Sequence, residues 1–443
     1  MTDLDAAYHQ LLERLFSARR FGVVLGLERL RAVLAALGDP QRRLGALVHV
    51  AGTNGKGSTA AMIAAMVRAH GRTAALYTSP HLTSVRERIV FEGEPIGRAA
   101  LLAAAARVAQ AGGDSLTFFE QLTAMALVEL AQRAPDVTIL EVGLGGRLDA
   151  TNVVDSDVAV VTGVALDHQA ILGDTLEQIA REKAGIFRRG KPAVIGVSGE
   201  AAAVPALYAE ALRLGAAPVE QLEEAAVAAV PPLSLRGAHQ RRNAAAAVAA
   251  VKALVGAGVL ADDPAARARG LLGAVHPGRL ELVPGSPQLV LDGAHNPHGA
   301  AALAAALVEL PAPRILVLAV SRDKDAGALV GALLPVVTAV ISTAYQQERA
   351  LPPQELAAKV ADAAAKVGAA GGAHAAKVAA VSRSAPELGA ALPLARQLAG
   401  PRGTVVVAGS LFLVGEARAM LLGADTDPVL LSDPAATPGN LRS

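Results

Sequence analysis

The sequence contains no cysteine and no tryptophan, and it has few aromatic residues of any kind. Among its 443 residues there are seven Phe and four Tyr. The lack of cysteine excludes disulfides, thiolate catalysis and cysteine-based zinc sites. Because aromatic rings are so scarce, the core must depend on aliphatic packing, and the adjacent pair Phe118 and Phe119 stands out.

Neither sign of charge dominates, and no long basic or apolar run occurs. Lys plus Arg number 41 against 40 Asp plus Glu, which gives a formal net charge of +1. An extended nucleic-acid surface would need clustered Lys and Arg, and a membrane helix would need about 18 uninterrupted apolar residues. The acidic, polar start MTDLDAAYHQ does not have the pattern of a secretory signal. We therefore expect a cytoplasmic enzyme, monomeric, with no nucleic-acid or membrane partner.

Short aliphatic runs alternate with helical patterns in two parts of the chain. Strands are expected at 46–51, 73–78, 137–142, 157–164 and 192–197, and then at 288–292, 314–320, 338–344, 377–381 and 404–408. Such runs lack period-2 alternation, which favours parallel sheets covered by helices on both faces. The polar ribbon Ser84–Pro95 is predicted to be a loop or hairpin. A turn at His276–Gly278 separates the two sets.

This pattern predicts an α/β protein with two doubly wound domains. Residues 1–280 would form the larger first domain, and residues 281–424 a smaller Rossmann-like domain. The Pro-rich, polar segment 425–443 is expected to be a disordered tail.

The most informative motif is AGTNGKGST, Ala51–Thr59, between an apolar strand and a helical pattern. A Gly-rich turn at that place directs backbone N–H groups toward phosphate oxygens. Lys56 can reach the terminal phosphates, and Ser58 or Thr59 offers a hydroxyl near Mg²⁺. The spacing is not that of a standard Walker A loop, because only two residues separate Gly52 from Gly55. An ordinary Gly-containing turn is the alternative reading.

Several polar residues follow expected strands, where ligands of open α/β sheets bind. Glu141 ends one strand, and an oxygen ligand there suits Mg²⁺, although a structural salt bridge is the alternative. Asp167 and His168 follow the next strand as metal ligands, acid/base groups or turn formers. Asp292 ends the first strand of the second set, just before a helix.

The phosphate-loop variant resembles that of the Mur-ligase superfamily, and within it the bacterial folylpolyglutamate synthases/dihydrofolate synthases. Further stretches resemble that family in the same order: LGLERL (25–30), YTSPHL (77–82), LTFFE (116–120), LEVGLGGRLDATN (140–152), ALDHQAILG (165–173), REKAGIF (181–187), PGRLELV (277–283), DGAHNP (292–297), RDKD (322–325) and AGSLF (408–412). The resemblance spans roughly residues 20–420.

The resemblance implies roles for individual residues. Nucleotide contacts would come from Thr53, Asn54, Gly55, Lys56, Gly57, Ser58, Asn243, Arg279 and Asp292. Metal ligands would be Ser79, Glu141, His168 and Lys183, the lysine being carbamylated by CO₂ in similar enzymes. The pterin substrate would contact Thr117, Phe118, Phe119, Glu120, Leu148, Asp149 and Ala150.

Residues of the second domain would serve the incoming amino acid. His295 is expected to meet that substrate or the reacting phosphoryl group, which makes it a catalytic candidate beside Lys56 and Lys183. Ser410, with Lys324 and Asp325 as weaker candidates, would bind glutamate. Alternatives from the residues alone are a cap at Asn243, a plain turn at Ser79 and a solvated linker charge at Arg279.

The activity implied is ATP- and Mg²⁺-dependent addition of L-glutamate to dihydropteroate and to reduced folates through an acyl phosphate, with K⁺ as a further candidate ion. Bifunctional members often carry Tyr at the position of Phe118, so a monofunctional folylpolyglutamate synthase is one alternative. A related ligase for a cell-wall precursor is another, and LTFFE and LGLERL count against it. A nucleotide-binding scaffold without ligase activity is the third, and the strand-end polar groups in both domains argue against it.

Overall fold

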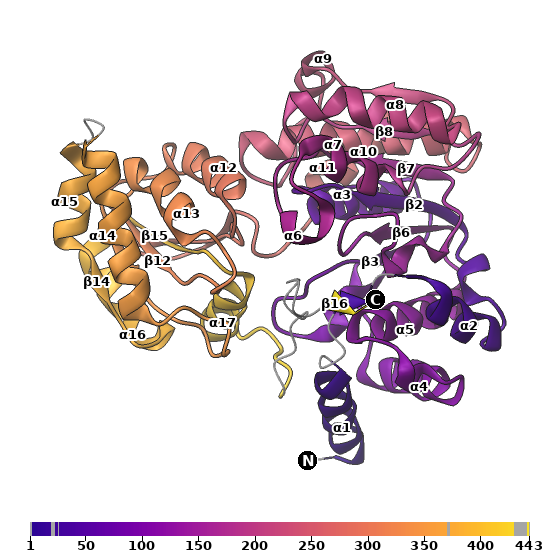
Figure 1. The fold of residues 1–443 in the computed structure, drawn as a ribbon, viewed down its shortest axis with the longest axis horizontal. Helices are drawn as coiled ribbons and strands as arrows, with labels where there is room; N and C mark the ends of the chain where they lie inside the picture. Colours follow the sequence, from indigo (N-terminus) through magenta and orange to yellow (C-terminus); the bar gives the residue numbers. More distant parts are fainter. Residues whose placement is uncertain (1, 19–22, 25, 370–372, 429–440, 443) are drawn as a thin grey trace. The chain divides into compact units, whose positions relative to one another are not determined.

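The computed structural model describes residues 2–18, 23–24, 26–369, 373–428 and 441–442. These residues form two compact units, each with its own sheet (Figure 1). Unit 1 comprises residues 1–234, 239–276 and 427–443, and unit 2 comprises 235–238 and 277–426. Within the described part of the chain, no helix is long and apolar enough to cross a membrane.

Unit 1 is built on an eight-stranded sheet in the order β5-β4-β3-β6-β2-β7-β8-β9. Its strands are β2 (Ala46–Ala51), β3 (Ala74–Tyr77), β4 (Ile89–Phe91), β5 (Glu94–Pro95), β6 (Val137–Glu141), β7 (Val158–Val161), β8 (Ala193–Ile195) and β9 (Val219–Gln221). From β3 to β9 the neighbouring strands are parallel, as predicted. The ribbon 84–95 contains the antiparallel pair β4–β5, which confirms the hairpin reading.

Helices cover both faces of the unit 1 sheet. They are α1 (Asp3–Ala18), α2 (Glu28–Ala36), α3 (Lys56–Ala69), α4 (Arg98–Gln110), α5 (Phe118–Arg133), α6 (Gln169–Leu172), α7 (Leu176–Ala184), α8 (Val204–Leu214), α9 (Glu224–Ala228), α10 (Ala238–Gly256) and α11 (Pro264–Gly273). Leu47 and Tyr77 belong to a buried cluster shared with α1, α2, α4 and α5. Helix α3 packs on β2, β3 and β6, and α11 packs on α3.

Unit 2 has a six-stranded sheet in the order β10-β11-β15-β12-β13-β14. Its strands are β10 (Glu281–Val283), β11 (Gln288–Leu291), β12 (Arg314–Leu318), β13 (Ala339–Ser342), β14 (Arg383–Ser384) and β15 (Thr404–Ala408). All neighbours are parallel except the pair β10–β11, so the sheet is mixed rather than purely parallel.

Successive side chains of each strand point to opposite faces of the unit 2 sheet, and helices pack on both faces. Its helices are α12 (Pro297–Leu307), α13 (Ala326–Leu333), α14 (Pro353–Ala369), α15 (Ala373–Val381), α16 (Leu388–Ala399) and α17 (Leu411–Leu422). Val290, Leu316 and Val406 pack in one cluster with α12 to α15. Helix α16 packs on β12 and β15, and helix α17 packs on β15 and β11. The result is the doubly wound arrangement that the alternating pattern predicted.

The strand expected at 377–381 is wrong, because these residues lie in helix α15. The run from Ala373 is rich in alanine, the best helix former, so propensity and the short apolar run favoured different structures. The strand that extends the sheet is instead β14, where Arg383 pairs with Ile341. The edge strand β9 lies outside the ranges that were expected to be strands.

Part of the segment 425–443, expected to be a disordered tail, is anchored in unit 1. Asp427 is 5% exposed and accepts hydrogen bonds from Tyr8 Oη at 2.7 Å, Ser84 Oγ at 2.9 Å and the Val85 N–H at 2.7 Å. The expectation therefore fails at this residue, whereas residues 429–440 and 443 lie outside the described part of the chain. Asp427 ties α1 to the turn after the TSPHL loop.

Replacing Asp427 with Asn should lower the free energy of unfolding by about 1–3 kcal/mol, because an amide N–H₂ would face buried donors. Chemical denaturation of the full chain measures the change. Glu220→Gln, at an exposed residue of β9, is the control and should have almost no effect. Equal stability of the two variants would show that the Asp427 contacts do not stabilise unit 1.

Candidate functional site

The phosphate loop lies between β2 and α3, at the carboxyl edge of the unit 1 sheet. Gly55 is the residue before α3 and has a φ of 84°, a left-handed conformation that favours glycine. A Cβ at this position would overlap the side-chain oxygen of Asn243. The N-terminus of α3 therefore points its unpaired N–H groups and the positive end of its dipole at the loop, as an anion site requires.

The loop is held by hydrogen bonds to the segment after β7. Thr53 Oγ1 donates to the Ala165 carbonyl at 3.1 Å and accepts from its N–H at 3.0 Å. Thr162 Oγ1 donates to the Asn54 carbonyl at 2.7 Å. Lys56, the first residue of α3, donates from Nζ to the Thr53 carbonyl at 3.2 Å, so its side chain lies over the loop.

Asn243 lies against this loop, although it is far away in the sequence. It is inside α10 and not at its start, so the alternative of a helix cap is wrong. Its Oδ1 accepts from Ser198 Oγ at 2.8 Å, and its Nδ2 donates to Gln240 Oε1 at 3.0 Å. Gln240 Nε2 donates to Ser58 Oγ at 3.2 Å. The sequence analysis missed Gln240, which the three-residue spacing from Asn243 on one helix face could have indicated.

Two of the four predicted metal ligands meet beside the loop. Glu141, at the end of β6, is 4% exposed and accepts from the Ser79 N–H at 3.1 Å. His168 is half-buried with a φ of 52°, and its backbone N–H donates to Asp167 Oδ1 at 2.9 Å. No group of three or more His, Asp or Glu suited to a metal occurs in the part of the chain that the structure describes.

Lys183, the fourth predicted ligand, is buried beside the phosphate loop. It is 4% exposed, and its Nζ donates to the Gly52 carbonyl at 3.1 Å. Burial, and then the charge of Lys56, lowers the pKa of Lys183 to about 7. A substantial fraction of neutral amine is therefore present near neutral pH, and the burial shows that Lys183 is not a solvated surface lysine.

The predicted pterin residues at the start of α5 have different environments. Thr117 and Glu120 form a capping box, in which each side chain accepts from the other's backbone N–H. Phe118 is fully buried, and the Arg88 guanidinium lies 5.5 Å from its ring centroid. Phe119 is half-buried, 6.2 Å from the Tyr77 ring. Of the two rings, Phe119 is therefore the one that remains partly accessible.

The other predicted pterin residues lie in the loop before the short helix η5 (Ala150–Val153) and at its first residue. Leu148 is half-buried and Ala150 is buried. Asp149 is 5% exposed and accepts from the N–H groups of Leu144 and Thr151, each at 2.9 Å. Burial raises the pKa of Asp149. A Cβ at Gly143 would overlap the ring of Phe119, so this loop and the start of α5 are in contact.

In unit 2, the DGAHNP segment lies at the carboxyl edge of the sheet. Asp292 accepts from the N–H of Leu280 at 2.8 Å and of Ala294 at 2.9 Å. The guanidinium of Arg279 lies against Gly293, where a Cβ would overlap it. His295 Nδ1 is 2.8 Å from the Gly293 carbonyl. The predicted residues Arg279, Asp292 and His295 are thus brought together.

Ser410 and Asp325 both cap helices, accepting from the N–H groups of Phe412 at 3.2 Å and of Ala328 at 2.9 Å. The sequence analysis missed Tyr345, whose hydroxyl is 2.6 Å from Ser321 Oγ and also bonds with Ser410. Its position just after β13 was the available signal. Lys324 lies in the loop after β12, in the turn before α13.

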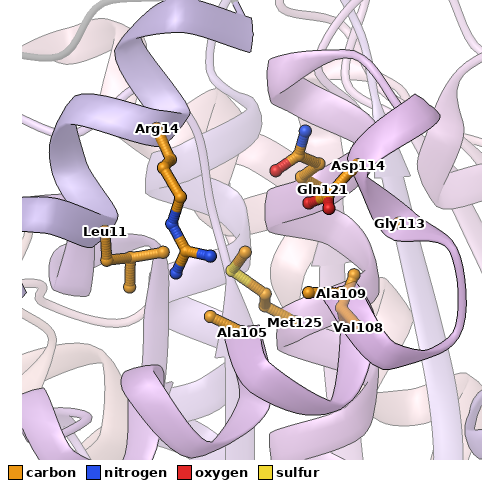
Figure 2. A pocket seen from close by; sticks show the side chains of 9 residues that line it. All are labelled: Leu11, Arg14, Ala105, Val108, Ala109, Gly113, Asp114, Gln121 and Met125. Carbon is orange, nitrogen blue, oxygen red and sulfur yellow. The ribbon is translucent and has the colours of Figure 1, made fainter.

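A small pocket lies elsewhere in unit 1, between α1, α4, α5 and the short helix η4 (Gly113–Ser115) (Figure 2). Leu11, Val108 and Met125 give it an apolar wall, with Arg14 and Asp114 among the polar residues. None of the predicted site residues lines it. We place the site at the phosphate loop, because polar side chains converge there from several strands.

Comparisons with known proteins identify the family of the chain. Residues 50–210 match the Mur ligase middle domain, and residues 278–411 match the Mur ligase glutamate ligase domain. The dihydrofolate synthase/folylpolyglutamate synthase of Mycobacterium tuberculosis is 39% identical over 374 residues, which cover 75% of this chain and 76% of that protein. The chain belongs to the dihydrofolate synthase/folylpolyglutamate synthase family.

Solved structures of the family match both units. The Mycobacterium tuberculosis folylpolyglutamate synthase complexed with ADP has a TM-score of 0.84 at 33% identity and covers 96% of this chain and 100% of that one. The Escherichia coli FolC in complex with DHPP and ADP has a TM-score of 0.80 at 33% identity, with coverages of 95% and 98%. The expected α/β fold with two Mur-ligase domains is confirmed.

One group of relatives is longer. The probable bifunctional folylpolyglutamate synthase/dihydropteroate synthase of Haloferax volcanii is 39% identical over 440 residues, which cover 93% of this chain. These residues make up 50% of that protein. The chain thus spans about half the length of this relative.

Substituting Gly55 by Ala should weaken ADP binding by about tenfold or more. The added methyl group would displace the Asn243 side chain, and the positive φ of residue 55 is strained for alanine. Isothermal titration calorimetry measures this. Gly71→Ala is the matched control: its φ is 74°, but nothing lies within 4 Å of the added Cβ. It carries the same backbone strain, so equal ADP affinity in both variants would contradict the role of this contact.

Proposed function

We propose that this protein is an ATP-dependent ligase that adds L-glutamate to dihydropteroate and to reduced folates. The observation that carries the proposal is the convergence of Lys56, Asn243, Glu141, Ser79 and Lys183 around one phosphate loop, in a chain whose second unit matches a glutamate ligase domain. A monofunctional folylpolyglutamate synthase is the second candidate, because residue 118 is Phe. Another Mur-type amino-acid ligase is a more remote alternative.

The chemistry requires activation of a carboxylate, which is a poor acyl donor. Transfer of the γ-phosphoryl group of ATP to a carboxylate oxygen forms an acyl phosphate and ADP. The amine of glutamate then attacks the acyl carbon, the C–O bond breaks, and phosphate leaves with formation of the amide. The protein needs no covalent nucleophile, only in-line positioning and neutralisation of charge. Lys56 and the N–H groups at the start of α3 are suited to hold the transferred phosphoryl group.

The donor set beside the loop suits a divalent cation. Mg²⁺ prefers oxygen and usually keeps waters and substrate phosphates as ligands, so a complete protein cage is not needed. Glu141, the Ser79 hydroxyl and carbamylated Lys183 would supply oxygens, and His168 is the remaining candidate ligand. When bound, the cation would neutralise phosphate charge. A solved Yersinia pestis relative complexed with AMPPNP and Mn ion supports divalent metal use in the family.

We infer that unit 2 receives the amino acid. Arg279, Asp292 and His295 would serve the nucleotide and the reacting group, while Ser410 and Lys324 would bind the carboxylates of glutamate. We also propose that the enzyme is a cytoplasmic monomer that binds small molecules and no nucleic acid, in line with its balanced charge.

The test is ADP release by purified full chain with ATP and Mg²⁺. We expect turnover only when glutamate and a pterin acid are both present, with dihydropteroate and with tetrahydrofolate. If, in the presence of glutamate, tetrahydrofolate supports turnover and dihydropteroate does not, the protein is the monofunctional synthase. Turnover with neither substrate would refute the proposed function.

Lys56→Ala should abolish ligation, with the fold intact by circular dichroism. A charge-assisted hydrogen bond to phosphate contributes about 1.5–3 kcal/mol, and more where charge develops in the transition state. Lys252→Ala, at an exposed lysine of α10, is the control and should keep full activity. Near wild-type ligation by Lys56→Ala would remove the phosphate-loop assignment.

Lys183 should carry a carbamate in the active enzyme. Its neutral amine attacks CO₂, a C–N bond forms and one proton leaves, so carbamate should increase as the pH rises through about 7, the pKa of this buried amine. The measurement is ¹³C NMR of enzyme equilibrated with ¹³C-bicarbonate. The carbamate signal should persist in Lys191→Ala, whose lysine pairs with Asp157, and disappear in Lys183→Ala. An unmodified amine in active enzyme would contradict the assignment.

Phe119→Ala should raise the KM for the pterin acid far more than the KM for ATP. Ring stacking adds about 0.5–1.5 kcal/mol beyond burial, and its loss removes uniform substrate binding. Phe91→Ala is the control, because that ring contacts Arg133 and not the candidate pocket. If both variants change the two KM values alike, Phe119 has no specific contact with the pterin.

A further inference from the structure

A chain of buried hydrogen bonds connects the strand before the phosphate loop to the predicted pterin pocket. His49, on β2, is fully buried, and its Nε2 is 2.8 Å from Thr151 Oγ1. Thr151 is also fully buried, and its Oγ1 is 2.5 Å from Asp149 Oδ1. His49 and Thr151 are 102 positions apart in the sequence. None of the predicted site roles uses His49.

The direction of each hydrogen bond follows from the number of protons. A threonine hydroxyl has one proton, and its short contact with a carboxylate oxygen uses that proton. His49 must then donate through Nε2–H. Its Nδ1 has no hydrogen-bond partner among the described residues, so a second proton there would have nothing to bond with. Burial lowers the pKa of His49 to about 3, and the ring is a neutral donor.

Asp149 is the last side chain in this series of hydrogen bonds, and it also bonds to backbone N–H groups. Its carboxylate accepts from the N–H of Leu144 at 2.9 Å, and the N–H of Gly143 faces it as well. Gly143 is the residue whose Cα lies against the ring of Phe119. The Asp149 carboxylate is therefore hydrogen-bonded to the stretch of backbone that contacts Phe119.

A buried histidine with one nitrogen unpaired is a costly way to fill a core, since its polar atom loses water without a replacement. An apolar side chain on β2 would avoid that cost. An apolar side chain would leave the buried Thr151 oxygen without the donor that helps to fix its orientation toward Asp149. The histidine is thus best explained by the orientation that it imposes.

We propose that His49 is a positioning residue for pterin recognition. Through Thr151 it orients the Asp149 carboxylate, which holds the Gly143–Leu144 backbone against Phe119. The strand that carries the phosphate loop would in this way also fix the pocket of the pterin acid. This inference rests on the proposed function, because it assumes that the substrate ring lies at Phe119.

The test compares KM values for dihydropteroate or tetrahydrofolate with those for ATP, using the full chain. Thr151→Val and His49→Met should raise the KM of the pterin acid by about tenfold and leave the KM of ATP within about twofold. Thr151→Ser, which keeps the hydroxyl, and His49→Gln, which keeps a donor at a similar reach, should restore the pterin KM. The double variant His49→Met, Thr151→Val should be no worse than either single change.

Thr138→Val controls for stability. Thr138 is fully buried on the neighbouring strand β6, and its Oγ1 donates to the Leu44 carbonyl at 2.7 Å, outside the chain from His49 to Asp149. It should lower the melting temperature as Thr151→Val does and leave the pterin KM unchanged. If Thr151→Val and Thr138→Val have the same pterin KM, His49 is only structural and the proposal is overturned.

The proposal can be tested even if a variant fails to fold, because Thr151→Ser and His49→Gln keep the packing. If His49→Met is the variant that fails, Thr151→Val against Thr151→Ser decides. A wild-type protein that turns over neither pterin acid refutes the proposed function and this inference with it. A wild-type protein that is active, with pterin KM values equal across Thr151→Val, Thr151→Ser and Thr138→Val, refutes the inference alone.

Discussion

The structure of unit 1 depends on satisfying the polar groups at the end of β2. A loop that receives phosphate presents several N–H groups to one point, and its carbonyls and side chains must find partners in the surrounding protein. Thr53 and Thr162 bond the loop to the segment after β7, Lys183 donates to Gly52, and Asn243 packs against Gly55. The loop is therefore preformed, and little conformational entropy remains to be lost when a nucleotide binds.

The same constraint places the other groups of the site. Parallel strands end at one edge, so Glu141 at the end of β6 lies beside the loop after β2 and receives the N–H of Ser79. The loop that follows β6 leads to Asp149, whose carboxylate accepts a hydrogen bond from the N–H of Leu144 in the same loop. The proposed phosphate, cation and acid subsites thus lie at neighbouring strand ends of one sheet, as expected for an enzyme that activates a carboxylate where the phosphoryl group is held.

The alternation of aliphatic runs and helices was sufficient to predict two doubly wound units, because buried parallel strands have a clear signal. The sequence motifs that follow the expected strands predicted the phosphate loop and the carboxylate at the end of β6. The sequence could not give the partners of these residues. Ser198 bonds to Asn243, and Gln240 bonds to both Asn243 and Ser58, from distant segments. Nothing in the sequence indicates that His49 contacts Thr151, 102 positions away. The strand expected at 377–381 failed because an alanine-rich run satisfies both a short strand and a helix. Phe118 and Phe119 are adjacent in sequence, yet only burial in the fold distinguishes the core ring from the half-buried one.

The central claim is that the acid is activated by phosphoryl transfer at this loop. Dihydropteroate or tetrahydrofolate labelled with ¹⁸O in the reacting carboxylate tests the claim most directly, with mass spectrometry of the released phosphate and of the nucleotide products. An acyl phosphate requires that one ¹⁸O from each carboxylate appears in inorganic phosphate, one per amide formed, with ADP as the nucleotide product. Label in AMP, or amide formation with unlabelled phosphate, would contradict the account.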